Sequence, residues 1–334
     1  MAALEQASDV LGKVYDAALF DLDGVIYVGQ HAVPGVVPVI NDLHEELGMT
    51  LTYVTNNASR SAQSVADHLT ELGLHVEAHD VVTSAQAGAA VMATLVPQGS
   101  SIYVLGSRDL MAEIEGVGLK PSQDVDAHHD GVIEGYWPDM PWRMLAQGCH
   151  VLNSGVPWVA TNMDLTIPTQ WGMAPGNGSM VNIVATAVGR RPTAVAGKPE
   201  VPLMQQSIDR AQAVRPIVIG DRLDTDILGA TNVGIDSLLV FSGVTTVREL
   251  LEAPEELRPT YISWDATGLA HSHPAVMQHG STFTVNDWSI VDGQLSGDSD
   301  ILDAIRVVSV ATWAGALSIA QATAQLSARG IAVG

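Results

Sequence analysis

The stretch DAALFDLDGVIYVG, residues 16–29, decides the fold of this chain. Its apolar residues 18–20 predict a short buried strand, and Asp21 and Asp23 follow where that strand ends. Side chains of an extended segment repeat every second residue, so we expect the two carboxylates on one side, and Gly24 permits a tight turn after them. Such a pair fits a turn, a loop metal site or a catalytic pair, and the stretch alone leaves all three open.

Strand and helix patterns alternate along much of the chain. They occupy residues 34–47, 49–57, 61–73, 215–234 and 236–243. Repeated strand–helix units predict an α/β fold with a Rossmann-like, doubly wound parallel-sheet core. Ligands of such sheets bind beyond the carboxyl ends of the strands, and polar clusters stand at three of these ends, at residues 21–23, 55–57 and 220–226. We therefore expect one polar rim that carries the chemistry.

The same patterns divide the chain into parts. Residues 97–191 form a second strand–helix region, which predicts an inserted α/β cap domain. The core then comprises residues 1–96 and 192–273, and residues 274–334 form a small C-terminal α+β extension.

The extension contains both kinds of pattern. Residues 281–293 predict strands and residues 300–317 predict a helix. The apolar face within 302–320 indicates that this segment docks on the chain's own core or on a partner chain, and both stay open. The uncharged run 307–328 is long enough for a membrane span, but seven Ser, Thr and Gln residues interrupt it, which favours a packed helix and no membrane span.

Composition narrows the class of partner. The 334 residues include 15 basic and 37 acidic side chains, with a formal charge of −22, so no broad basic patch for nucleic acid or an anionic membrane is expected. The single cysteine, Cys149, excludes an internal disulfide framework and is expected to be an inert core residue. Residues 1–16 lack a long apolar run, so no signal peptide is expected, and a cytoplasmic location fits a reduced thiol.

The acids after the first strand suit phosphoryl transfer. A carboxylate can attack phosphorus and form an aspartyl-phosphate, and this transfer depends mainly on positioning and on neutralised charge. Mg²⁺ prefers oxygen ligands, so a rim of carboxylates predicts a magnesium site. One acid of the pair could face phosphorus and the other the leaving oxygen.

Four motifs in a fixed order resemble the haloacid dehalogenase superfamily of phosphohydrolases. They lie at residues 21–25, 55–57, 197–199 and 220–226, and the resemblance covers residues 15–272. It implies that Asp21 is the nucleophile. Asp23 would protonate the leaving oxygen and then activate water, with its backbone carbonyl on the metal.

The remaining motif residues receive roles from the same resemblance. Thr55 would donate its hydroxyl to the phosphoryl group, and Lys198 would neutralise nucleophile and phosphate. Asp221 would bind Mg²⁺ directly together with Asp21 and Asp23, and Asp226 would support the metal ligands from behind. The other residues of the first two motifs, Gly24, Asn56 and Asn57, are expected from the resemblance to bind substrate.

The position of the cap refines the resemblance. Residues 23 and 55 lie 32 positions apart, which leaves no room for a cap, whereas residues 55 and 198 lie 143 apart. A cap in that place resembles the C2 class, and its branch is that of the NagD-like proteins and 4-nitrophenylphosphatases. Relatives of this branch often form dimers through the cap, so a homodimer is one arrangement that the resemblance allows.

The cap loop and the extension point to a substrate. Residues 159–181 resemble the cap loop of that branch, in which Asn162 and Asp164 are candidates to face the non-phosphate end of the substrate. An N-cap or turn role fits Asp164 equally well. The extension, with the motifs upstream of it, resembles the actinobacterial glycerol-3-phosphate phosphatases, which implies a small phosphorylated metabolite with hydroxyl groups.

Alternatives from the same reasoning stay open here. Another phosphoester could be the substrate, such as pyridoxal phosphate, a nucleotide, phosphoglycolate or 4-nitrophenyl phosphate, and a non-catalytic phosphometabolite sensor is the rival from another class. The histidine pairs 128–129 and 271–273 lack partners at helical spacing, so they are expected to be surface histidines and not metal ligands.

Overall fold

The computed structural model describes residues 4–169 and 171–334. The chain forms two compact units, and each is described by itself. The first comprises Met1–Tyr53, Glu71–His75 and Ala211–Gly334, and the second comprises Val54–Thr70 and Val76–Arg210. The four-part division into core, cap and extension stays a prediction.

A six-stranded sheet forms the core of the fold. Its strand order is β15-β14-β13-β1-β4-β5. The strands are β1 (Ala17–Phe20), β4 (Thr50–Thr55), β5 (Val81–Thr83), β13 (Pro216–Gly220), β14 (Asp236–Val240) and β15 (Tyr261–Ser263). Strand β1 pairs in parallel with β13 and with β4, and all four of its residues are buried, as expected for a strand covered on both faces. The predicted Rossmann-like α/β core is thereby confirmed.

Short helices and a hairpin complete the core part of the first unit. They are α1 (Leu11–Val14), β2 (Tyr27–Val28), β3 (His31–Ala32), α2 (Val36–Leu47), the π-helix η2 (Leu223–Ile227), α9 (Leu228–Val233), α10 (Val247–Glu252), η3 (Glu255–Leu257) and η4 (Ala266–Ala270). Helix α2 ends at Gly48, which adopts a left-handed conformation with φ of 69°.

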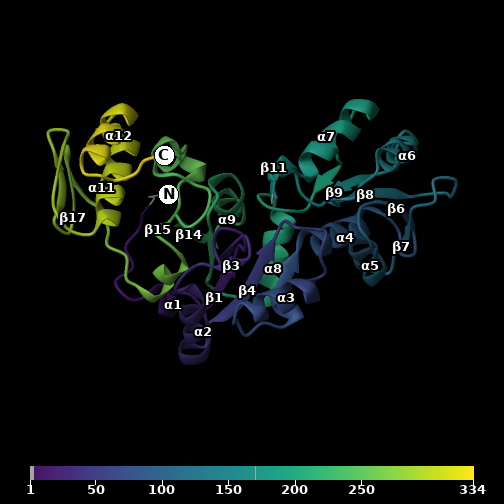
Figure 1. The fold of residues 1–334 in the computed structure, drawn as a ribbon, viewed down its shortest axis with the longest axis horizontal. Helices are drawn as coiled ribbons and strands as arrows, with labels where there is room; N and C mark the ends of the chain where they lie inside the picture. The colour runs from purple at the N-terminus through teal and green to yellow at the C-terminus, as the bar shows by residue number, and fades with distance from the viewer. Residues whose placement is uncertain (1–3, 170) are drawn as a thin grey trace. The chain divides into compact units, whose positions relative to one another are not determined.

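The C-terminal residues of the first unit add an antiparallel sheet and two helices. The elements are β16 (Met277–His279), β17 (Thr282–Val285), β18 (Trp288–Val291), β19 (Gln294–Ser296), α11 (Ile301–Trp313) and α12 (Ile319–Ala328). In Figure 1, α11 and α12 lie beside β17. Ile305 and Val308 of α11 share one apolar cluster with Leu250 and Ile262, so this segment docks on the chain's own core.

Residues 307–328 do not form the single packed helix that the sequence predicted. Helix α11 ends at Trp313, and α12 begins at Ile319 after a turn in which Gly315 has a φ of 74°. A glycine in the left-handed region ends the first helix because other residues adopt this conformation only with strain. No helix among the described residues is long and apolar enough to cross a membrane.

The second unit contains its own sheet. Its strand order is β12-β9-β8-β6-β7, and the pairings are parallel. The elements of this unit are α3 (Ala62–Glu71), η1 (Ala78–Asp80), α4 (Ser84–Leu95), β6 (Ser101–Leu105), α5 (Arg108–Gly116), β7 (Lys120–Ser122), β8 (Gly131–Glu134), α6 (Trp142–Leu152), β9 (Trp158–Ala160), β10 (Thr166–Thr169), β11 (Gly172–Pro175), α7 (Asn177–Val188), β12 (Ala194–Val195) and α8 (Val201–Ala211).

Two apolar clusters sandwich this sheet. One joins it to α4 and α5, and the other joins its opposite face to α6 and α7 (Figure 1). The predicted α/β cap sheet is thus present. Cys149 is half-buried and packs at the edge of the second cluster.

Four histidines were predicted to lie on the surface, and this prediction is wrong for two of them, His129 and His273. His129 is buried between Ser101 Oγ and the Asp124 carbonyl, at 3.2 and 2.8 Å. His273 is buried as well, with Nε2 at 3.0 Å from the Gly268 carbonyl. Local sequence could not show this burial because each histidine also has a partner from a distant segment, Ser101 for His129 and Arg306 for His273.

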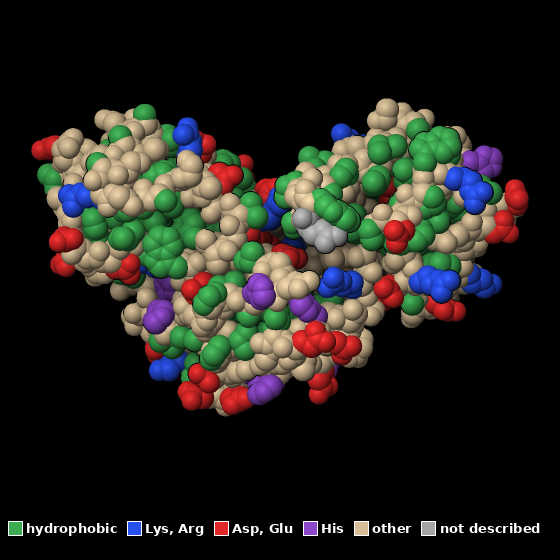
Figure 2. Space-filling view, viewed as in Figure 1, with side chains coloured by type: hydrophobic (Ala, Val, Ile, Leu, Met, Phe, Trp, Pro, Cys, Tyr) green, Lys and Arg blue, Asp and Glu red, His purple; other side chains and the backbone are tan. Residues whose placement is uncertain are grey.

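Acidic side chains outnumber basic side chains on the surface. On the face shown in Figure 2, Asp and Glu side chains are spread over the surface, whereas Lys and Arg side chains are few and form no extended patch. This matches the formal charge of −22.

Candidate active site

The first acidic loop leaves β1 as a tight turn. The backbone N–H of Asp21 donates to the Ile219 carbonyl at 2.8 Å, which extends the ladder with β13 past the strand end. Gly24 then adopts a φ of 84°, and its N–H donates to the Tyr27 carbonyl at 2.8 Å. The turn predicted at Gly24 is therefore present, and the Asp23 side chain is exposed on it.

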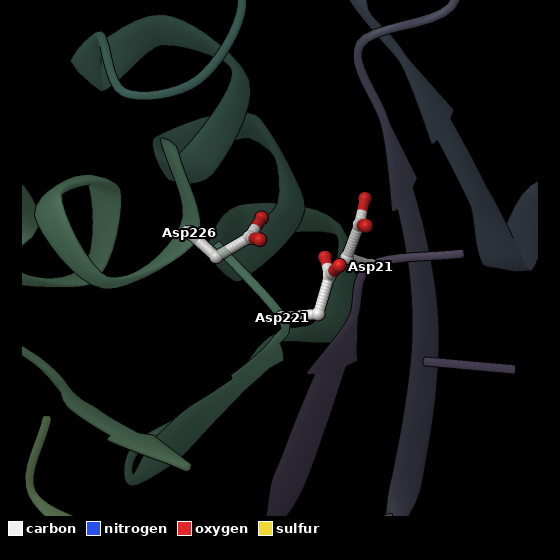
Figure 3. A group of neighbouring side chains, drawn as sticks. All are labelled: Asp21, Asp221 and Asp226. Carbon is white, nitrogen blue, oxygen red and sulfur yellow. The ribbon is translucent and has the colours of Figure 1, made fainter. Parts of the chain in front are cut away.

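Three carboxylates converge in the first unit. One oxygen each of Asp21, Asp221 and Asp226 lies within 4.8 Å of the others. Figure 3 shows Asp21 at the end of β1, Asp221 after β13 and Asp226 on the following helical turn, with the three side chains directed toward one region. Asp221 and Asp226 are each only 1% exposed.

Backbone groups hold two of these carboxylates in place. Asp221 Oδ2 accepts a hydrogen bond from Val244 N–H at 2.7 Å, and Asp226 Oδ2 accepts one from Arg222 N–H at 3.1 Å. A Cβ atom added at Gly24 or Gly243 would overlap the Asp221 carboxylate. The backbone therefore forms a cradle that only glycine permits.

The donor set fits a divalent cation. Three carboxylates this close repel one another, and burial of two of them strengthens the repulsion because water screens them less. An oxygen-liganded cation removes this cost, and carboxylates are the ligands that Mg²⁺ prefers. Asp21, Asp221 and Asp226 could therefore hold Mg²⁺.

Thr55, Asn56 and Asn57 lie in the second unit, where β4 ends. Thr55 is buried, and its Oγ1 accepts a hydrogen bond from Asn57 N–H at 3.1 Å. Asn57 Oδ1 accepts from the N–H and from the hydroxyl of Ser59, each at 2.8 Å. These bonds wind the chain into a compact loop directly after the strand.

Lys198 belongs to the same unit and is only 4% exposed. Its Nζ donates to the Val54 carbonyl at 3.5 Å, and its backbone N–H donates to Asn56 Oδ1 at 2.8 Å. A Cβ at Gly197 would come within 2.6 Å of Asn56 Oδ1, so this glycine allows the close approach of the two loops.

The cap loop joins this group. Asn162 Nδ2 donates to the Asn56 carbonyl at 2.6 Å, and Asn162 Oδ1 accepts from Asp164 N–H at 3.1 Å. Asp164 is thus part of a turn, and it does not cap α7, whose N-cap residue is Gly176. The Asp164 carboxylate accepts from Asn56 Nδ2, with both oxygens at 3.1 Å.

The predicted residues therefore fall into two sets. The first unit holds Asp21, Asp23, Gly24, Asp221 and Asp226, and the second holds Thr55, Asn56, Asn57, Asn162, Asp164 and Lys198. Within each set the structure brings together residues that are far apart in sequence. Their chemical roles stay predictions.

Sequence reasoning missed the loop that supports the acids. Ser242 Oγ donates to the Gly24 carbonyl at 2.6 Å, and Val244 N–H holds Asp221. The sequence pattern held one indication of this loop. Residues 236–243 predict a strand, and the carboxyl ends of the strands in a parallel sheet lie at one rim. Ser84, whose hydroxyl donates to the Asn56 carbonyl at 2.6 Å, gave no such signal.

Two family models match the chain. One, described as haloacid dehalogenase-like hydrolase, matches residues 18–120, and one described as HAD-hydrolase-like matches residues 195–269. D-glycerol 3-phosphate phosphatase of Mycobacterium tuberculosis is 39% identical over 259 residues, which are 78% of this chain and 72% of that protein. An acid sugar phosphatase of Staphylococcus saprophyticus is 34% identical over 253 residues, 75% of this chain and 94% of that protein.

Solved structures of two phosphatases are similar to this chain. The crystal structure of glycerol phosphate phosphatase from Mycobacterium tuberculosis in complex with magnesium matches with a TM-score of 0.84 and 33% identity, over 96% of this chain and 98% of that one. The p-nitrophenyl phosphatase from Archaeoglobus fulgidus matches with a TM-score of 0.70 and 25% identity, over 77% of this chain and 98% of that one.

Proposed function

Because the chain belongs to the haloacid dehalogenase-like hydrolases and is a phosphatase of their NagD and 4-nitrophenylphosphatase branch, we propose that it hydrolyses glycerol 3-phosphate to glycerol and phosphate with the help of Mg²⁺. The observation that carries the proposal is the convergence of Asp21, Asp221 and Asp226 at the carboxyl ends of β1 and β13.

Asp21 and Asp23 divide the chemistry between them. Asp21 attacks phosphorus and forms an aspartyl-phosphate, while Asp23 gives its proton to the glycerol oxygen that leaves. Asp23 then takes a proton from water, which attacks the aspartyl-phosphate and releases phosphate. The exposed side chain of Asp23 suits this exchange of protons. A non-catalytic sensor would have no use for this second acid.

The other site residues and Mg²⁺, when bound, offset the negative charge of the phosphoryl group and of the carboxylates. Thr55 donates its hydroxyl to the phosphoryl oxygens and Lys198 contributes a positive charge, as the family resemblance implies. The backbone N–H groups of Val244 and Arg222 hold the Asp221 and Asp226 carboxylates in place.

Glycerol 3-phosphate is favoured over other esters by two kinds of support. The relative at 39% identity is named for this substrate, and a structural relative with a TM-score of 0.84 is named a glycerol phosphate phosphatase. In the cap loop, the Asp164 carboxylate would accept hydrogen bonds from substrate hydroxyls and repel a second anionic group. A cytoplasmic location, where small phosphorylated metabolites are present, is part of this proposal.

The test is phosphate release from a panel of phosphomonoesters, with Mg²⁺ and with EDTA. We expect glycerol 3-phosphate to show the highest kcat/KM, EDTA to abolish turnover, and Asp21→Asn to lower kcat by at least about 10³-fold because the nucleophile is lost. Faster turnover of pyridoxal phosphate, a nucleotide or phosphoglycolate would overturn the substrate but keep the mechanism. Full activity of Asp21→Asn would overturn the mechanism.

A further inference from the structure

The side chain of Asn56 engages both of its N–H donors, and its oxygen, within the protein. Its Oδ1 accepts from Lys198 N–H at 2.8 Å, and its Nδ2 donates to the Lys198 carbonyl at 3.0 Å and to both carboxylate oxygens of Asp164 at 3.1 Å. A primary amide offers two N–H donors and one carbonyl oxygen. Both donors and the oxygen are therefore occupied, and no donor is left for a phosphate oxygen.

The backbone of Asn56 is fixed as well. Its carbonyl accepts from Ser84 Oγ and from Asn162 Nδ2, each at 2.6 Å. Both donors are buried, and Ser84 is fully inaccessible. The absence of a Cβ at Gly197 lets the Lys198 segment reach Asn56. One residue thus fixes two separate segments, one with the proposed phosphate-binding lysine and one with the cap-loop carboxylate.

We propose that Asn56 is a positioning residue, whose side chain holds the Lys198 backbone and the Asp164 carboxylate in one fixed arrangement and makes no contact with the phosphate. This replaces the substrate contact that the sequence predicted for Asn56. The inference rests on the proposed function for Lys198 and Asp164. A group of this kind acts through the geometry of its neighbours, so its loss changes the rate of the chemical step more than substrate binding.

Asn56→Asp is the most informative variant because it keeps the size of the side chain and the acceptor for Lys198 N–H. It removes both donors and places a negative charge against Asp164. We expect kcat for glycerol 3-phosphate to fall by about 30- to 100-fold, with KM changed by less than about 3-fold. Asn41→Asp is the matched control, since Asn41 joins Gly73 and His75 in the same manner in the first unit, and its kcat and KM should equal those of the wild type.

A reversed pair isolates the contact between the two side chains. In the double variant N56D/D164N, the new amide can donate to the new carboxylate, so the direction of the hydrogen bond is exchanged. We expect kcat to recover by about 5- to 10-fold relative to Asn56→Asp, but not fully, because the donor to the Lys198 carbonyl is still missing. An Asn56→Asp variant with unchanged kcat, or one whose loss lies entirely in KM, would overturn the proposal.

A measurement that needs no turnover separates this inference from the proposed function. Asn56→Ala removes the acceptor of Lys198 N–H, so hydrogen exchange at the Lys198 amide should accelerate by at least about 10-fold. Unchanged exchange would overturn the positioning role even if the enzyme hydrolyses glycerol 3-phosphate, whereas a wild type without phosphatase activity would overturn the function alone. If the Asn56 variants do not fold, Ser84→Ala, which removes one bond to the Asn56 carbonyl, should lower kcat several-fold and leave KM unchanged; an unaltered kcat would contradict the proposal.

Discussion

Single glycines leave the space that the carboxylates of the acidic cluster occupy. Gly24 and Gly243 lie against the Asp221 carboxylate, and Gly220 lies against the Asp226 side chain, so that an added Cβ would overlap these groups. At Gly24 the φ of 84° imposes a second restriction, because side chains are strained in that region. Gly243 has no such restriction, so a substitution there tests the steric contact alone.

Gly243→Ala is expected to weaken metal binding without unfolding the protein. The added methyl group must displace the Asp221 carboxylate, and misplaced metal ligands or their supports typically cost about 10- to 100-fold in metal affinity. The Mg²⁺ concentration that gives half-maximal phosphate release should therefore rise by about 10-fold or more. Gly116→Ala is the matched control, since a Cβ there meets nothing within 4 Å. Equal Mg²⁺ dependence of the two variants would argue against the cradle.

Some residues of the site could be predicted from sequence and others could not. Asp21 and Asp221 each follow an apolar run, so their place at strand ends, and hence at one rim, followed from the chain pattern. Ser84 and Ser242 contact the loops only because distant segments meet in the fold, and their own neighbours in sequence carry no sign of it. The hydrogen bonds of the Asn56 side chain likewise depend on the meeting of three segments, those of Asn56, Asp164 and Lys198.

Among the elements, β8 has an unusual end. Glu134 is the last residue of this strand and is fully buried, on the same strand face as Val132, which belongs to the apolar cluster of α6 and α7. Its two carboxylate oxygens have no hydrogen-bond partner among the described residues. Burial raises the pKa of Glu134 from 4.5 to about 8. Burial and the nearby Glu134 also raise the pKa of the Cys149 thiol.

The buried carboxyl should make the second unit less stable at alkaline pH. Because its pKa is higher in the folded chain, the folded state holds the proton more tightly, and the free energy of unfolding falls as pH rises from about 4.5 to about 8, by up to about 1.4 kcal/mol per pH unit. Glu134→Gln cannot ionise and should lose this fall. Urea unfolding at pH 5, 6.5 and 8 measures the difference between wild type and variant.

The comparison needs a second glutamate. Glu115 is exposed on α5, and Glu115→Gln should follow the wild type at all three pH values. A constant difference between wild type and Glu134→Gln from pH 5 to pH 8 would show that Glu134 does not hold its proton in the folded state. The burial of Glu134 could not be predicted from sequence, because an acid at a strand end also fits an exposed rim.

At the scale of the whole molecule, the C-terminal extension belongs to the core of the first unit. One apolar cluster runs from Leu239 and Ile262 in the parallel sheet to Ile305 in α11. A buried arginine of α11 crosses the same junction, since Arg306, paired with Asp303 of its own helix at 2.6 Å, donates to the Ile262 carbonyl at 3.0 Å. The sequence predicted an apolar face on this helix but could not say what covers it, because periodicity does not identify the partner.

This continuity predicts that extension and core unfold together. Ile305→Ala should lower the free energy of unfolding by about 2–5 kcal/mol, since it removes buried methyl groups and leaves a cavity in the shared cluster. Hydrogen exchange should accelerate equally at the amides of β14 and of β17, because both report the same opening. Ile301→Ala, at an exposed position of the same helix, should change stability by less than about 0.5 kcal/mol. Faster exchange confined to residues 277–328 would mean that the extension opens independently, and the shared cluster would then contribute little to holding it on the core.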